Sequence, residues 1–143
     1  MQGLHLTADL HHCQCDVAWL TDAARLGQHC TQAVAAAGLQ SVAQLFHAFP
    51  ATGLGPGGVT ATVLLAESHL CVHTWPELRA VTLDVYVCNF GGDHSSKAHT
   101  LLDALIGLFE PGAVQRQTLV RGRSALPQGN LAHAGGGIPV PAP

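Results

Sequence analysis

The sequence has little charge: six of its 143 residues are Lys or Arg, nine are Asp or Glu, and the formal net charge is -3. Binding to a nucleic-acid backbone needs a basic surface, which six cationic residues do not provide. No apolar run approaches the roughly 20 residues that span a bilayer, and the first residues lack the basic and then apolar pattern of a signal peptide. We therefore expect a cytoplasmic protein that binds neither nucleic acid nor membranes.

The sequence also lacks any CxxC pair, although it contains five cysteines. A zinc ribbon or a thioredoxin-type redox site would need such pairs, so neither is indicated. An odd number of cysteines cannot all pair within one chain, and we expect reduced thiols. Four of them are interpreted as small buried side chains: Cys13, Cys15, Cys30 and Cys71.

Hydrophobic residues make up 48% of the chain, which is enough for the core of one domain of this length. Alternating and three-and-four apolar spacings predict five strands and two helices. The strands are expected at 4–10, 41–49, from 59 into 67–77, at 81–88 and at 113–120, and the helices at 17–37 and 96–109. This β-α-β-β-β-α-β order predicts an α+β fold, a two-layer α/β sandwich with a mostly antiparallel sheet and two helices on one face. We expect a single domain over 1–123 and a disordered tail at 124–143.

The densest group of reactive side chains lies at 67–77, which reads ESHLCVHTWPE. If 76–80 form the turn of a hairpin, residues whose numbers sum to about 156 lie opposite each other. Ser68 would then face Cys88 on the same side of the sheet. His73 has the opposite parity, so a site that uses Ser68 and His73 together would need a bulge in the strand.

These residues resemble the pyruvoyl-dependent S-adenosylmethionine decarboxylases of bacteria and archaea. The resemblance is carried by the ESHxxxHTWPE run, by Asp84 and Cys88 on the next strand, and by shorter segments at 46–49 and 121–123. It covers most of the chain except the tail.

The resemblance implies a proenzyme that cuts itself between Glu67 and Ser68. The serine hydroxyl would attack the preceding carbonyl to give an ester, and β-elimination and hydrolysis would leave a covalent pyruvoyl group derived from Ser68. Such a ketone forms a Schiff base with a substrate amine and accepts the electrons released when carbon dioxide leaves. The implied enzyme is a homodimer of cleaved protomers that converts S-adenosylmethionine to its decarboxylated form, the aminopropyl donor for spermidine synthesis.

The same resemblance implies roles for five further residues. His73 corresponds to the histidine that handles protons during self-processing, and Cys88 to the acid that protonates the substrate carbon after decarboxylation. Phe49 corresponds to the aromatic ring that stacks on adenine, and Glu77 to the carboxylate that binds the ribose. Thr60 lies where the family often has a processing serine, and it keeps the hydroxyl.

Three alternatives remain open. The loop at 50–58 is longer than typical for the family, and Asn89 and Phe90 replace its usual glycine. An ornithine or arginine decarboxylase of the same family is therefore the first alternative. An unprocessed, non-catalytic homologue is the second. The third is a zinc-binding protein that would use three residues of one strand face: His69, Cys71 and His73.

Overall fold

The computed structural model describes residues 2–122, so the predicted tail and both ends of the predicted domain lie outside the described residues. The strands are β1 (Gly3–His11), β2 (Ser41–Ala48), β3 (Val59–Leu65), β4 (Ser68–Trp75), β5 (Ala80–Cys88) and β6 (Ala113–Arg121). The helices are α1 (Ala18–Thr21), α2 (Ala23–Ala36), α3 (Ser95–Phe109) and the single 3-10 turn η1 (Pro76–Leu78). None of the described helices has the length and apolar character needed to cross a membrane.

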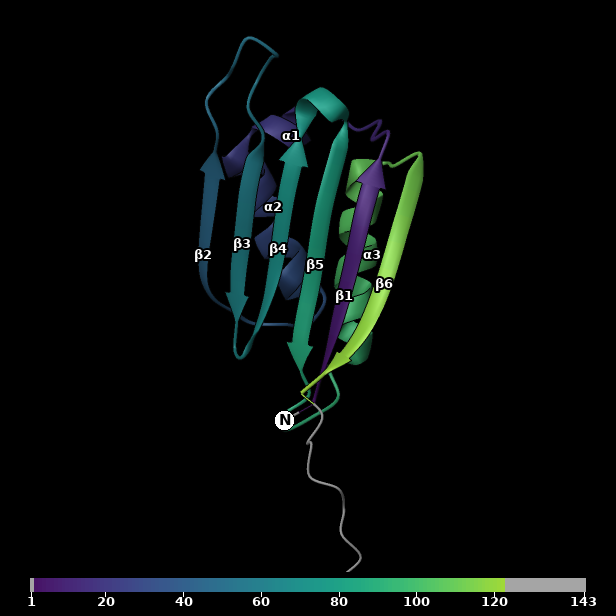
Figure 1. The fold of residues 1–143 in the computed structure, drawn as a ribbon. Helices are drawn as coiled ribbons and strands as arrows, with labels where there is room; N and C mark the ends of the chain where they lie inside the picture. The colour runs from purple at the N-terminus through teal and green to yellow at the C-terminus, as the bar shows by residue number, and fades with distance from the viewer. Residues whose placement is uncertain (1, 123–143) are drawn as a thin grey trace, which may run out of the picture.

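The strands form one sheet in the order β2-β3-β4-β5-β1-β6, and every neighbouring pair is antiparallel. Helices α2 and α3 lie side by side on one face of this sheet (Figure 1). Helix α2 packs on β2 and β3, and α3 on β1 and β5. The predicted two-layer α+β architecture is therefore confirmed, and the uncovered side of the sheet is called the open face below.

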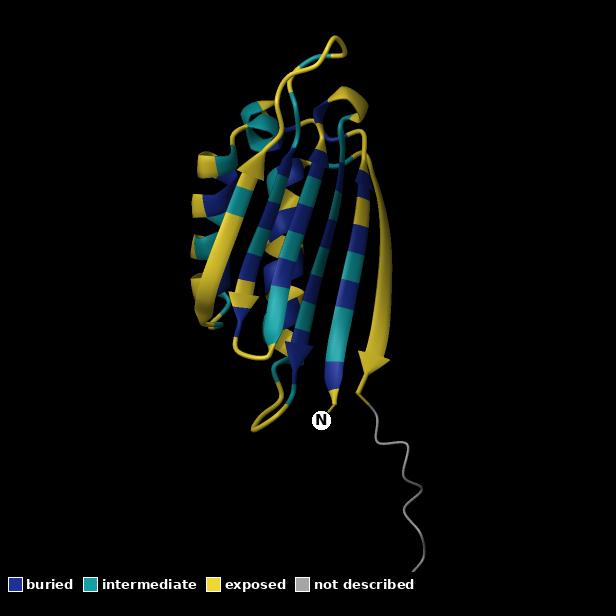
Figure 2. Ribbon diagram, turned by 60° about the vertical axis from the view of Figure 1, so that its left-hand side comes forward, coloured by how far each residue is buried: buried dark blue, intermediate teal, exposed yellow. Residues whose placement is uncertain are grey.

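The core lies between the sheet and the helices. On β5, Val81, Leu83, Val85 and Val87 are buried, whereas the residues between them on the open face are half-buried. The same alternation marks β1, β3 and β4 as dark and light bands, while the edge strands β2 and β6 are largely exposed (Figure 2). Thr74 ties the sheet to the first helix, because its buried hydroxyl donates to the Leu20 carbonyl at 2.6 Å and accepts from the Val59 amide at 2.8 Å.

The single long strand predicted from residue 59 into the 67–77 window is wrong. The chain turns at Ala66 and Glu67, so that Leu65 pairs with Ser68 and two strands, β3 and β4, replace one. Glu67 adopts a left-handed conformation with φ of 56°. The polypeptide therefore reverses direction immediately before Ser68.

The register of the β4–β5 hairpin differs from the prediction by one residue. His69 pairs with Tyr86 and Trp75 with Ala80, so paired numbers sum to one less than expected. The cause is the connection, where the 3-10 turn η1 ends at Arg79 in a left-handed conformation with φ of 49°. One step further along this register Ser68 comes opposite Val87, and the prediction that Ser68 directly faces Cys88 is wrong.

The helix predicted over 17–37 is also divided. Asp22 has an extended conformation between α1 and α2, and its carboxylate accepts a hydrogen bond from the Arg25 amide at 3.0 Å. This is the standard N-cap interaction, which begins a new helix. Asp16, the predicted cap, instead accepts from the Ala18 amide ahead of the short helix α1.

Candidate functional site

The bond between Glu67 and Ser68 lies in the tight turn that joins β3 to β4. A left-handed conformation at a residue with a side chain costs on the order of 1 kcal/mol or more, and such strain persists only where the surrounding structure holds it. Here the flanking pair Leu65 and Ser68 belongs to the β3–β4 ladder. The carbonyl of Glu67 is therefore presented at an exposed hairpin tip beside the hydroxyl of the next residue.

Cys88 meets Ser68 at this same end of the sheet. The Cys88 backbone amide donates a hydrogen bond to Ser68 Oγ at 3.0 Å. Both residues line a cavity of about 240 Å³, together with Glu67, Phe90 and His94. The predicted proximity of Ser68 and Cys88 is thus present although the register is shifted, because both residues stand at the ends of their strands.

A second hollow of about 440 Å³ adjoins the first and is lined by Glu67, Tyr86, Cys88 and Phe90. Cys88 and Glu67 contribute to both cavities. The ring of Phe90 is 73% exposed, which makes it an apolar wall that solvent reaches from outside. We refer to Glu67, Ser68 and Cys88 together as the Ser68 half-site.

The other predicted residues lie at the opposite end of the sheet. Thr60 Oγ1 and His73 Nδ1 share a hydrogen bond of 3.1 Å between β3 and β4. Phe49, Thr60 and Glu77 line a cavity of about 330 Å³ there. We refer to Phe49, Thr60, His73 and Glu77 as the His73 half-site.

The backbone around Phe49 explains why the glycines of the 50–58 loop are needed. The Phe49 amide donates to the Gly58 carbonyl at 2.9 Å. A Cβ atom on Gly57 would collide with the Phe49 carbonyl, and one on Gly58 would collide with the Thr74 carbonyl. This close packing anchors the base of the loop beside β4 and holds Phe49 near Glu77.

The two half-sites do not meet within one chain. Ser68 and His73 are separated by five residues of the same strand, and β4 pairs with β5 without a register shift from His69 to Trp75. Five residues of strand extend about 16 Å, which is more than the two side chains can bridge. The bulge that a shared site would require is absent from the described part of β4, and His73 has the opposite parity to Ser68, as predicted.

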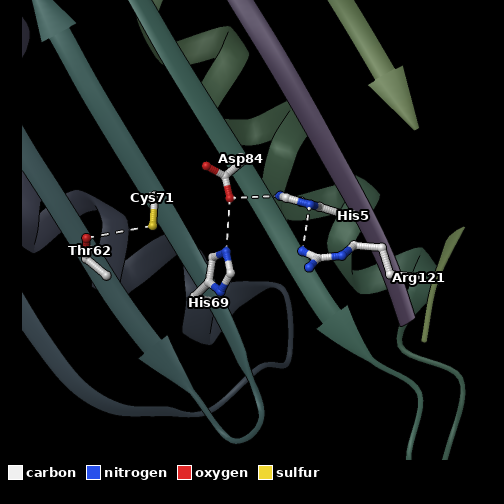
Figure 3. Close-up of polar contacts among 6 residues, drawn as sticks. All are labelled: His5, Thr62, His69, Cys71, Asp84 and Arg121. Atoms are coloured by element: carbon white, nitrogen blue, oxygen red, sulfur yellow. Dashed lines mark hydrogen bonds and ion pairs between the residues drawn. The ribbon is translucent and has the colours of Figure 1, made fainter. Parts of the chain in front are cut away.

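A hydrogen-bonded network occupies the open face beside the Ser68 half-site (Figure 3). Asp84 Oδ2 lies 3.1 Å from Nε2 of both His5 and His69. Arg121 Nη1 donates to His5 Nδ1 at 3.3 Å, so neutral His5 carries its proton on Nε2 and donates it to Asp84. Asp84 is therefore the shared acceptor of two imidazoles from neighbouring strands.

The predicted zinc set of His69, Cys71 and His73 is not assembled. Cys71 Sγ contacts Thr62 at 3.7 Å and His73 contacts Thr60, whereas His69 turns to Asp84. Among the described residues, the group whose donor atoms lie close enough for a metal is His5, His69 and Asp84. In that group the hydrogen bond from Arg121 directs the His5 Nε2 proton toward Asp84, which favours the hydrogen-bonded network.

The other thiols are protonated structural side chains. Burial raises the pKa of Cys13 to about 11 and that of Cys30 to about 12, and burial also raises the pKa of Cys15 and of Cys71. Cys13, Cys15 and Cys30 are buried and Cys71 is half-buried. The interpretation of the first three as buried core residues is confirmed.

Sequence reasoning missed His94 and Tyr86 as residues of the Ser68 end. Tyr86 is the open-face neighbour of Cys88 on β5, and strand alternation alone could have indicated it. His94 reaches the cavity through the loop between β5 and α3. No local pattern in the sequence shows where that loop returns.

Comparisons with known proteins agree with this geometry. Residues 4–122 match the family model for S-adenosylmethionine decarboxylase. The S-adenosylmethionine decarboxylase proenzymes of a Hydrogenobaculum species and of Aquifex aeolicus are 36% and 37% identical over 121 residues, 84% of this chain and 81% of each relative. The crystal structure of the adenosylmethionine decarboxylase from Aquifex aeolicus superposes with a TM-score of 0.73 at 34% identity, covering 85% of this chain and 92% of that one.

Proposed function

Because the chain belongs to the S-adenosylmethionine decarboxylase family, we propose that it is a proenzyme of S-adenosylmethionine decarboxylase. It cleaves itself between Glu67 and Ser68 and then decarboxylates S-adenosylmethionine. The observation that carries this proposal is the strained turn at Glu67, which places the Ser68 hydroxyl next to the bond to be cut and inside a cavity shared with Cys88. The ornithine or arginine decarboxylase alternative is not favoured, because the matching relatives are named for S-adenosylmethionine.

Self-processing begins with an acyl shift at the turn. Ser68 Oγ attacks the Glu67 carbonyl carbon, the carbon–nitrogen bond breaks, and an ester joins the two residues. Loss of the Ser68 Cα proton then expels the Glu67 carboxylate, and hydrolysis with release of ammonia leaves the pyruvoyl group at residue 68. The hydrogen bond from the Cys88 amide orients Ser68 Oγ, and opening the turn releases the strain at Glu67.

The residues of the Ser68 half-site fit a pyruvoyl group and its reaction. When present, the pyruvoyl ketone condenses with the substrate amine and accepts the electron pair left by carbon dioxide. The Cys88 thiol lies beside residue 68 and supplies a proton to the substrate carbon. Phe90 and Tyr86 form apolar walls around this position, which limit the access of water.

A second copy of the chain completes the site. His73, Thr60, Phe49 and Glu77 are about 16 Å away along β4 within one chain, yet processing and substrate binding need them beside residue 68. The open face is free of covering elements in the described residues and carries half-buried side chains from β3, β4 and β5. A homodimer in which one protomer supplies the Ser68 half-site and its partner supplies the His73 half-site satisfies both requirements.

An intact-mass measurement on the purified protein tests the proposal, with Ser68→Ala as the control. Two fragments that separate at the Glu67–Ser68 bond, the second blocked at its first residue, are expected, while the S68A chain stays whole. A wild-type chain that remains uncleaved would contradict the proposal and favour the unprocessed homologue. Carbon dioxide release from S-adenosylmethionine, ornithine and arginine then identifies the substrate, and a release that is fastest with either amino acid would overturn the assignment.

A further inference from the structure

His94 stands at the entrance to α3 and lines the cavity that contains Ser68 and Cys88. Its Nδ1 atom is buried and has no hydrogen-bond partner among the residues that the structure describes. Leaving a buried polar atom unpaired costs about 1–3 kcal/mol, so an orphan of this kind asks for an explanation. The ring has no capping role to explain it, because the His94 side chain makes no capping hydrogen bond to α3.

The loop that carries His94 is fastened to the strand end that carries Cys88. Asn89, the residue after Cys88, accepts a hydrogen bond from the His94 amide at 2.9 Å through Oδ1. Its Nδ2 donates to Ser95 Oγ at 3.2 Å, and its backbone amide donates to the Gln2 carbonyl at 2.8 Å. The imidazole is therefore placed relative to the Ser68 half-site by direct contacts with the neighbour of Cys88.

Ser68 has the complementary deficiency. Its Oγ accepts from the Cys88 amide, but among the described residues no acceptor receives the proton of its own hydroxyl. A cavity of about 240 Å³ has room for water, and a site with polar groups on its walls holds water in hydrogen-bonded positions. An unused O–H donor and an unused imidazole acceptor thus line the same small space.

We propose that His94 is the proton acceptor for the acyl shift, acting on Ser68 through one water molecule of this cavity. As Ser68 Oγ bonds to the Glu67 carbonyl carbon, the hydroxyl proton passes to the water and a water proton passes to His94 Nδ1. The imidazolium returns its proton to the Ser68 nitrogen when the carbon–nitrogen bond breaks. No proton is gained or lost overall, and the step needs no other reactant.

This inference rests on the proposed self-processing, and the experiment separates the two. The unprocessed chain is expressed rapidly or in vitro, and the rate of cleavage is followed by intact mass for wild type, His94→Ala, His94→Gln and His99→Ala. His99 is an exposed residue of α3, so H99A controls for losing a histidine from that helix. General base catalysis contributes about 100-fold or more, and we expect H94A and H94Q to cleave about 100-fold more slowly than H99A.

Two further readings distinguish a proton acceptor from a packing residue. Added imidazole should restore cleavage of folded H94A in a saturable way and leave H94Q, whose side chain fills the space, unchanged. Hydroxylamine, which cuts an accumulated ester, should not accelerate H94A because the ester does not form. Cleavage of H94A at the H99A rate, slow cleavage without imidazole rescue, or rapid cutting by hydroxylamine would each overturn the role of His94. Failure of the wild-type chain to cleave would overturn the proposed function itself.

Discussion

A mixture of two inactive variants should regain self-cleavage if the site is shared between two chains. Ser68→Ala removes the nucleophile but keeps the His73 half-site, and His73→Ala does the reverse. Within one chain these residues are about 16 Å apart along an unbroken strand, so neither variant can complete its own site. In a mixed dimer the Ser68 of one chain meets the His73 of the other, and one complete site is formed.

The expected yield follows from the symmetry of a two-chain assembly. Random pairing of equal amounts gives about half mixed dimers, and each mixed dimer cuts only its H73A chain. About half of the H73A chains should therefore be cleaved at the Glu67–Ser68 bond, while the S68A chains stay whole. Expressed alone, each variant should remain uncut or be cut far more slowly.

The assay is co-expression with tags of different mass, followed by denaturing mass spectrometry to score each chain. Native mass spectrometry on the same sample measures the fraction of mixed dimers. Wild type co-expressed with S68A is the matched control, because its Ser68 always has a His73 available from either partner. Mixed dimers with no cleavage of the H73A chain would refute the shared site, and so would full cleavage of H73A expressed alone.

Three further predictions concern the fold that carries the site. In an S68A background, Glu67→Gly should raise the free energy of unfolding by about 0.5–1 kcal/mol, because glycine tolerates the left-handed turn; urea unfolding measures this, and a loss of stability would contradict the strain. Asp84→Asn should lower stability by about 1–3 kcal/mol, because it weakens two hydrogen bonds to a charged acceptor; an unchanged urea midpoint would count against the network. The raised pKa of Cys30, about 12 in the folded state against 9.0 as reference, means that its contribution to stability is complete below pH 9 and is lost as pH rises toward 12; Cys30→Ala should flatten that alkaline decline in pH-dependent urea unfolding.

The sequence predicted the layers of the fold better than it predicted the turns. On β5 the alternation of Val81, Leu83, Val85 and Val87 follows directly from the burial of one sheet face, and the prediction was correct. The reversal at Glu67 carries no glycine, proline or asparagine to indicate it, so alternation ran through the turn unnoticed. The register error has a similar origin, because a 3-10 turn that ends with Arg79 in a left-handed conformation has no distinctive local pattern.

The site was predictable residue by residue but not as an arrangement. Strand geometry alone shows that Ser68 and His73 cannot meet on one straight strand, and the sequence argument identified that conflict through parity. It proposed a bulge as the solution, whereas the structure keeps β4 regular. The network around Asp84 depends on three strands, β1, β4 and β5, that are brought together only by the order of the sheet.

A regular β4 with its two functional ends about 16 Å apart also links maturation to assembly. The residue that becomes the cofactor and the histidine that helps to make it lie on the same strand, where they cannot react with each other. Contact between them requires two copies facing in opposite directions, which is the arrangement that a two-fold axis produces. Each protomer would then be processed only in the dimer in which it also works, so the strained turn at Glu67 stays intact until the partner that completes the substrate site is in place.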